Sequence, residues 1–322
     1  MVRARSLRPR FAPCLRRLLP PVAVALTLLA GACERAPTPE KVDMARREQL
    51  PTHAAEQPKG ALRIAVGGMI TPKAGFAYYR RFLDYIGEKT GRHVEFVDRD
   101  GYAEINKLVQ EQGVSMAFVC GGPYVDGHRQ FGMELLAAPQ AYGGTVYYSY
   151  IIVPADSPIS RLEMLRGKTF AFTDPMSNTG ALVPTFLVAG LGSTPERFFS
   201  KLQYSGSHDK SIEAVAEHLV DGAAVDSLIW EYAHRTEPAL TAKTKVIVKS
   251  DPYGIPPVVV PKELDPALKQ QLRAVLLEAH NDAKGREILA GMMIDRFVPI
   301  EDGAYDSIRA MQEKIAAAKK RP

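Results

Sequence analysis

From Ala61 onward, short runs of apolar residues alternate with segments of helical spacing, and this pattern predicts repeated β-α units. The apolar runs at residues 62–66 and 94–97 predict buried strands. Each is followed by a segment with apolar residues three or four positions apart that ends at a glycine. A third apolar run, residues 116–120, ends at a Gly-Gly-Pro turn. Such units predict an α/β fold with a largely parallel sheet and helices on both faces.

A long β-rich run at residues 146–153 predicts a crossing into a second α/β set, which extends to about residue 248. The run at residues 256–260 predicts the return, and the rest of the chain has helical spacing, with segments at residues 266–280, 284–293 and 304–318. Roughly 260 residues are too many for one simple core, so we expect two lobes.

The N-terminus has the pattern of an export signal. Six arginines in the first 17 residues precede an apolar run at residues 21–30, which is too short to span a bilayer. Small residues then lead to Cys33, as in a bacterial lipoprotein signal whose cysteine becomes the lipidated first residue. A plain secretory signal or an uncleaved anchor is the alternative. We expect a periplasmic protein anchored to the membrane by lipid at Cys33, with residues 33–60 as a flexible tether.

Net charge and cysteine content both change once the signal segment is set apart. The chain has a formal net charge of +5, but residues 1–32 contain six arginines and no acid, so the mature chain is near −1. The basic isoelectric point therefore gives no indication of nucleic-acid binding. Beyond Cys33 only Cys120 remains, which excludes an intramolecular disulfide in the mature chain. Cys120 ends an apolar run, as a packed thiol would.

The small polar turn at residues 174–180 is the main candidate for chemistry. It follows a predicted strand at residues 169–173 and precedes a predicted helix, so several backbone N–H groups lie free at one place. Ser177, Asn178 and Thr179 add side-chain donors, and the helix dipole favours negative charge there. No lysine or arginine lies in the turn, which favours a small oxyanion over a nucleotide. The alternative is an ordinary helix N-cap.

In several motifs the chain resembles the phosphate, phosphite and phosphonate solute-binding proteins of ABC transporters. The similar segments are residues 174–184, residues 206–209 with His208, residues 225–227 with Asp226, residues 148–153, and Tyr102. The resemblance implies a periplasmic-binding-protein (type II) fold, with two α/β lobes joined by two crossing strands that act as a hinge. It implies that the ligand lies in the cleft. The residues it assigns to the oxyanion are Ser177, Asn178 and Thr179, with His208 and Tyr102 completing the shell.

The other candidates each have a structural alternative. A histidine at a helix start can donate an N–H to an anion, and we expect the pKa of His208 to rise in the complex; otherwise it caps the helix. A carboxylate at Asp226 suits a ligand that has a proton or an amine, because two bare anions repel; otherwise it is a turn residue. Tyr102 and Tyr124 supply phenol donors or pack at helix starts.

Two departures from the family concern the ligand. Pro256 or Pro257 stands where aminophosphonate binders place a carboxylate, and Cys120 stands where the family often has an aromatic residue. Both favour a smaller anion such as phosphate or phosphite over an aminophosphonate. A thiol beside the cleft also suits an alternative, a periplasmic sensor that binds arsenite through Cys120 and acts on a histidine kinase.

The sequence therefore predicts a lipid-anchored, monomeric solute-binding protein with an ABC permease as its partner. We expect no enzyme activity, no cofactor and no resident metal, because the chain lacks a nucleophile elbow, a His-Glu-x-x-His motif and a phosphate-binding loop. The expected organisation is a signal at residues 1–32, a tether at 33–60, lobe 1 at 61–153 plus 256–322, and lobe 2 at 154–255.

Overall fold

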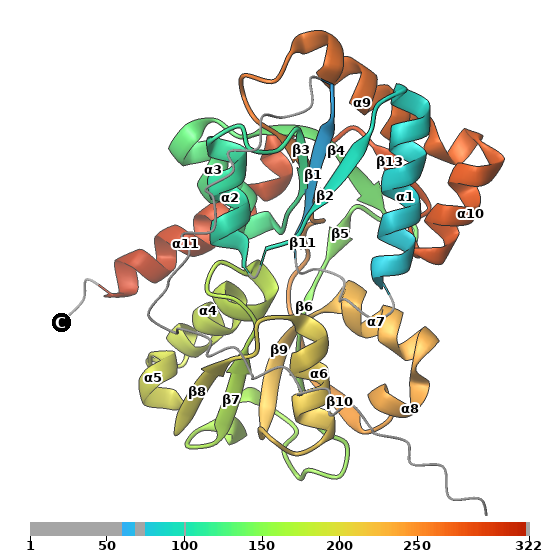
Figure 1. The fold of residues 1–322 in the computed structure, drawn as a ribbon. Helices are drawn as coiled ribbons and strands as arrows, with labels where there is room; N and C mark the ends of the chain where they lie inside the picture. Colours follow the sequence, from blue (N-terminus) through green and yellow to red (C-terminus); the bar gives the residue numbers. More distant parts are fainter. Residues whose placement is uncertain (1–59, 68–74, 100, 320–322) are drawn as a thin grey trace, which may run out of the picture. The chain divides into compact units, whose positions relative to one another are not determined.

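The computed structural model describes residues 60–67, 75–99 and 101–319, all within the unit Ala54–Pro322. The predicted signal, Cys33 and the tether up to residue 59 lie outside the described residues. Within the described part, two separate sheets are each covered by helices on both faces, and a third, two-stranded sheet lies between them in the chain (Figure 1).

The first sheet has six strands in the order β13-β4-β12-β3-β1-β2. Strands β1, β2 and β3 run parallel, whereas β12 and β13 pair antiparallel with their neighbours. The strands are β1 (Leu62–Val66), β2 (Val94–Val97), β3 (Met116–Phe118), β4 (Glu134–Gln140), β12 (Val258–Val260) and β13 (Arg296–Val298). The helices of this lobe are α1 (Gly75–Thr90), α2 (Tyr102–Gln110), α3 (Gly121–Phe131), α9 (Pro266–Glu278), α10 (Ala283–Gly291) and α11 (Asp306–Lys319).

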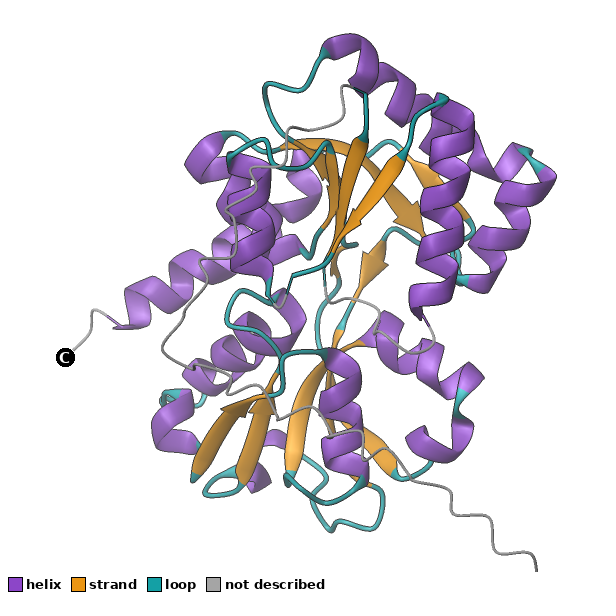
Figure 2. Ribbon diagram, in the orientation of Figure 1, coloured by secondary structure: helices purple, strands orange, loops and turns teal. Residues whose placement is uncertain are grey.

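Alternation along β1 explains why this sheet has two covered faces. Leu62, Ile64 and Val66 pack in one buried cluster with α1, α9 and α10, and Ala65 between them packs in another with α2, α3 and α11. Successive strand residues point to opposite faces, so a strand with buried apolar side chains on both faces requires helices on both sides. Figure 2 shows those helices flanking the strands.

The second sheet has five strands in the order β10-β6-β9-β7-β8. Its strands are β6 (Ser149–Pro154), β7 (Thr169–Phe172), β8 (Lys201–Tyr204), β9 (Gly222–Asp226) and β10 (Thr244–Lys249). Its helices are a π-helical turn at Asn178–Leu182, α4 (Val183–Gly190), α5 (Pro195–Phe198), α6 (His208–Ala216), α7 (Ser227–Thr236) and α8 (Pro238–Thr241). Short 3-10 turns lie at Leu162–Leu165, Ala279–Asn281 and Asp302–Tyr305.

The chain passes between the sheets twice, at β5 (Val146–Tyr147) and at β11 (Tyr253–Gly254), and these two short strands pair antiparallel. The run at residues 146–153 is therefore two strands, because β6 pairs within the second sheet. The first crossing lies before Ser149 and not at residue 153, where the sequence analysis placed it. The second crossing, expected near residue 255, follows β11.

The last helix, α11, is in contact with both lobes. It packs on α3 of the first lobe and on α4 of the second. Its residues Ile308 and Met311 belong to the same buried cluster as Val183 at the start of α4.

Candidate functional site

The polar turn predicted as an anion site follows β7 and begins a helix, as the sequence indicated. Ser177 is the N-cap, and its Oγ accepts a hydrogen bond from the backbone N–H of Gly180 at 3.0 Å. The helix starts as one π-helical turn before continuing as α4. Any side chain at position 180 would overlap the hydroxyl of Thr173, so glycine is required for the helix start to lie this close to the strand. Ser177 therefore caps the helix, which was the alternative to an anion-binding role for this turn.

Three side-chain oxygens of this region are buried without a hydrogen-bond partner among the described residues: Thr173 Oγ1, Asn178 Oδ1 and Thr179 Oγ1. Thr179 and Asn178 have no exposed surface, and Thr173 is 1% exposed. A buried polar group without a partner costs about 1–3 kcal/mol, so such groups are rare unless they serve a purpose. Asn178 Nδ2 donates to Tyr147 Oη at 3.1 Å. If the Asn178 amide group is rotated by half a turn, Nδ2 takes the position where Oδ1 has no partner.

His208 and Asp226 lie against one another at the starts of α6 and α7. The backbone N–H of Asp226 donates to His208 Nδ1 at 3.0 Å, so the ring proton is on Nε2, which is buried without a partner among the described residues. Burial lowers the pKa of His208 to about 3. His208 is thus a neutral donor at physiological pH, and the expectation that an anion raises its pKa does not fit this geometry, because Nδ1 already accepts a hydrogen bond.

Asp226 is fully buried at the end of β9. Its Oδ1 accepts from the backbone N–H of Leu228 at 2.7 Å, and Oδ2 has no partner in the described part of the chain. Burial raises the pKa of Asp226 to about 7, which the nearby N–H groups of the α7 start only partly offset. The carboxyl group therefore holds a proton far more readily than an exposed aspartate does.

The first lobe contributes Tyr102 and Cys120. The backbone N–H of Tyr102 donates to Asp174 Oδ2 at 3.3 Å, across the two lobes, and the Tyr102 hydroxyl is buried without a partner among the described residues. Burial is the main cause that raises the pKa of Tyr102 well above its usual value, so its hydroxyl stays a neutral donor. The ring of Tyr102 lies over Gly67, where an added Cβ would be 2.8 Å from ring carbon Cε1.

Cys120 is the N-cap of α3 and not the end of a strand. Its Sγ lies 3.2 Å from Tyr147 Oη, and the residue has no exposed surface. Burial raises the pKa of the thiol, so Cys120 is held as a neutral thiol. Tyr147, on β5, was not predicted as a site residue. Its only indication in the sequence was its place in the aromatic run at the crossing.

Tyr124 does not join these residues. Its hydroxyl donates to Asp302 Oδ1 at 2.6 Å, and its ring packs on Tyr305 with the ring centres 4.7 Å apart. Tyr124 lies one turn along α3 from Cys120, and that step turns its side chain toward α11 and the 3-10 turn before it.

We call the converging group the polar cluster: Tyr102, Thr173, Asn178, Thr179, His208 and Asp226. A small pocket opens beside it, lined by Gly101, Tyr102, Thr173, Asp174 and residues 206–208. Hydrogen bonds and backbone pairs connect the cluster, since Ser149 pairs with Asp226 in the sheet and its Oγ donates to the carbonyl oxygen of Thr179 at 2.6 Å.

The two lobes meet closely at this place. A side chain at Gly122 would overlap the carbonyl oxygen of Met176, so the start of α3 lies against the turn that holds Asn178. Among the described residues there is no group of three or more histidine, cysteine or acidic side chains placed to hold a metal ion. No described helix has the length and apolar content needed to cross a membrane.

A sequence profile described as the periplasmic substrate-binding protein of ABC phosphonate transporters matches residues 64–305. The chain belongs to this family. The resemblance drawn from the motifs is therefore confirmed. The family consists of solute-binding transport components of the periplasm, which are not a class of enzymes.

Family members of known name are distant in sequence. The phosphonates-binding periplasmic protein of Escherichia coli K12 is 28% identical over 227 residues, which cover 69% of this chain and 67% of that protein. The phosphate-import protein PhnD of Mycolicibacterium smegmatis is 24% identical over 310 residues, 89% of this chain and 92% of that protein.

Solved structures of the family confirm the two-lobed type II fold. A binding protein of an ABC phosphonate transporter from Pseudomonas aeruginosa has a TM-score of 0.76 at 25% identity, covering 81% of this chain and 88% of its own. PhnD1 from Prochlorococcus marinus, solved with methylphosphonate, has a TM-score of 0.73 at 18% identity, covering 80% and 98%.

Proposed function

We propose that this protein captures a small phosphorus oxyanion (phosphate, phosphite or a phosphonate) in the periplasm and delivers it to an ABC permease. The observation that supports this most directly is the polar cluster. Buried hydrogen-bonding groups from both lobes converge there without partners among the described residues, and the residues lining the adjoining pocket include no lysine or arginine. Neutral donors and helix starts suit an anion that is held by many hydrogen bonds and not by a counter-charge.

In this proposal the oxygens of the ligand accept from Tyr102 Oη, Thr179 Oγ1 and His208 Nε2. Asn178 contributes its amide, and Ser177 contributes its hydroxyl proton while its oxygen caps the helix. Each contact to a charged oxygen is worth about 1.5–3 kcal/mol. The ligands of related proteins agree in kind, since the relatives include phosphonate-binding, phosphate-import and methylphosphonate-bound proteins.

Asp226 has a separate part in the proposal. Its pKa is near 7, so the carboxyl group can be protonated or ionised. When protonated it donates a hydrogen bond to the ligand, and when ionised it accepts one from a protonated ligand. Either arrangement avoids repulsion between two bare anions.

Cys120 is assigned to packing. An arsenite sensor needs a thiolate, and burial raises the pKa of this thiol, so no observation favours the sensor over the transport protein. We accordingly keep the permease as the proposed partner, and we propose the lipid anchor at Cys33 and a monomeric state with it. Loss of radiolabelled palmitate incorporation in a Cys33→Ala variant, with wild type as the positive control, tests the anchor.

The test of function uses the exported chain without its signal, with Ser in place of Cys33 so that no free tether thiol interferes. Phosphate, phosphite, methylphosphonate and 2-aminoethylphosphonate are compared by thermal unfolding and calorimetry, with sulfate and arsenite as controls. A cognate ligand at 100 times its dissociation constant should stabilise the fold by about 2.7 kcal/mol. Stabilisation by none of the phosphorus compounds would overturn the proposal.

A further inference from the structure

The π-helical turn at Asn178–Leu182 leaves one backbone carbonyl group without a donor from its own helix. In α-helical bonding the carbonyl of Thr179 would accept from the N–H of Val183, but that N–H donates to the carbonyl of Asn178. In π-helical bonding the donor would be residue 184, which is a proline and has no N–H. Neither helical donor is therefore available to the Thr179 carbonyl.

Ser149, at the start of β6, supplies the missing donor. Its Oγ donates to the Thr179 carbonyl oxygen at 2.6 Å. Ser149 is 1% exposed and Thr179 has no exposed surface, so water does not reach this carbonyl in place of the hydroxyl. Because a buried carbonyl without a partner is costly, the turn depends on a side chain from a strand 30 positions earlier in the chain.

The backbone of Ser149 is fixed on both sides. In the sheet Ser149 pairs with Asp226 of β9. On its other side its N–H donates to Ser250 Oγ at 2.9 Å, and its carbonyl accepts from the Ser250 N–H at 3.0 Å. The hydroxyl is therefore attached to paired strands next to the crossings, and groups held on such elements place their partners more precisely than groups on loops do.

The bonding pattern of the turn decides where two side chains of the polar cluster lie. The unpartnered oxygens Asn178 Oδ1 and Thr179 Oγ1 both belong to this turn. Without the Ser149 hydroxyl, the Thr179 carbonyl would compete for the N–H of Val183, and the turn would tighten from π-helical to α-helical bonding. That change would rotate Asn178 and Thr179 relative to the rest of the cluster.

We propose that Ser149 is a positioning residue for ligand binding: it occupies the Thr179 carbonyl, holds the turn in its π-helical form, and so keeps Asn178 and Thr179 in place for the oxyanion. Ser149 acts through the turn and does not touch the ligand. This role rests on the proposed function, because it is measured as affinity for an oxyanion held in the polar cluster.

A double-mutant cycle between Ser149 and Pro184 tests this role by calorimetry with phosphate and methylphosphonate. Ser149→Ala should weaken binding about tenfold, the loss expected for one hydrogen bond to a charged oxygen. Pro184→Ala restores a backbone N–H that can donate to the Thr179 carbonyl, since the α-helical alternative, the carbonyl of Gly180, already accepts from the Thr173 N–H at 3.2 Å. In the Pro184→Ala background, Ser149→Ala should therefore weaken binding less than about threefold.

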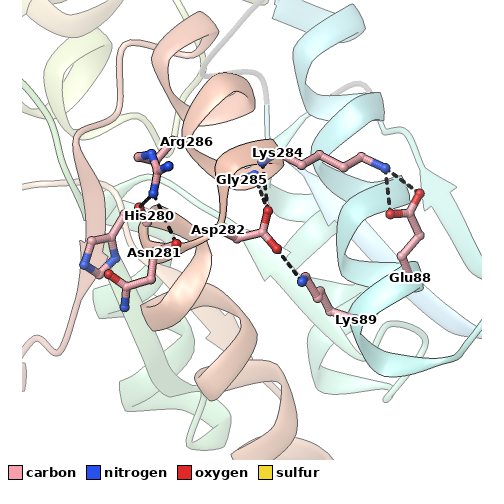
Figure 3. Close-up of polar contacts among 8 residues, drawn as sticks. All are labelled: Glu88, Lys89, His280, Asn281, Asp282, Lys284, Gly285 and Arg286. Atoms are coloured by element: carbon pink, nitrogen blue, oxygen red, sulfur yellow. Dashed lines mark hydrogen bonds and ion pairs between the residues drawn. The ribbon is translucent and has the colours of Figure 1, made fainter.

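Two controls separate positioning from stability. Thr185→Ala removes a hydroxyl that donates to the Ala181 carbonyl oxygen at 2.7 Å, which is the same kind of bond further along the same helix. Asp282→Ala removes the N-cap of α10 in the first lobe, where the carboxylate accepts from the Lys284 N–H and forms an ion pair with Lys89 (Figure 3). Both variants should unfold at lower urea concentration and bind like wild type.

An affinity of Ser149→Ala equal to that of wild type, or an equal loss in both backgrounds, would overturn the positioning role while leaving the proposed function standing. Binding of no phosphorus compound by wild type would overturn both. If Ser149→Ala alone does not fold, the double variant decides: it should fold and bind within about threefold of Pro184→Ala. A double variant that fails to fold or to bind, where Pro184→Ala does both, would refute the role of Ser149.

Discussion

Replacing Thr179 by valine should change affinity and stability in opposite directions. The Thr179 hydroxyl is fully buried and has no hydrogen-bond partner among the described residues, so the protein without ligand gains nothing from it. Valine has nearly the same shape and no hydroxyl. The free energy of unfolding of the ligand-free protein should therefore stay the same or rise by about 1–3 kcal/mol, the cost of burying an unpaired hydroxyl.

Binding of the oxyanion should weaken in the same variant. The lost hydrogen bond to a charged oxygen is worth about 1.5–3 kcal/mol, which corresponds to roughly a tenfold to hundredfold rise in dissociation constant. Calorimetry with the cognate ligand measures the affinity, and urea unfolding without ligand measures the stability.

Two matched variants separate binding from folding. Thr169→Val removes a hydroxyl that donates to Asp221 Oδ2 at 2.8 Å and accepts from the Asp221 N–H at 2.9 Å, away from the cluster, so it should lose stability and keep its affinity. Ser177→Ala should lose both, with about 1 kcal/mol of stability from the missing helix cap. If Thr179→Val behaves like Thr169→Val, the Thr179 hydroxyl is structural and our reasoning about the cluster fails.

Four further predictions concern the same site. His208→Ala should weaken binding without changing its pH dependence, and the ring of His208 should show no NMR titration from pH 5 to 8, because burial holds its pKa near 3. Asp226→Asn should become more stable relative to wild type as pH rises from about 4 to 7. The carboxyl group of Asp226 has a pKa near 7 in the folded protein, so it stabilises the folded wild type at low pH, and this contribution is lost as pH rises to 7. Equal pH profiles for the two proteins would contradict this. Gly122→Ala should fold normally but bind at least tenfold more weakly by calorimetry, since its methyl group would overlap the Met176 carbonyl oxygen when the lobes meet. Cys120→Ser should bind phosphorus oxyanions like wild type and unfold at lower urea, whereas arsenite stabilisation of wild type that the variant lacks would restore the sensor interpretation.

Periodicity predicted most of the fold because β-α units are local. The strands at residues 62–66 and 94–97 and the helices near the C-terminus are confirmed. The β-rich run at residues 146–153 divides into two strands in the structure, because β5 pairs with β11 whereas β6 pairs with β9 and β10. Pairing between residues a hundred positions apart leaves no local pattern.

The candidate site shows the same limit. Helix starts and small polar residues indicated Asn178, Thr179 and His208, and the structure brings these together, although their contact with a ligand stays a prediction. Tyr147 was missed and Tyr124 does not join the cluster, because aromatic residues near a turn look alike in sequence and only the packing of α3 and β5 separates them.

The contact of α11 with both lobes has a consequence for the thermodynamics of closure. Ile308 and Met311 on this helix share one buried cluster with Val183 of α4, so separating the lobes must expose apolar surface on one side of α11. Exposed apolar surface raises the heat capacity. Ligand binding that closes the lobes should therefore show a more negative heat-capacity change than burial of the ligand alone can supply. A calorimetric titration at several temperatures would report the movement of α11 even with an ion as small as phosphate.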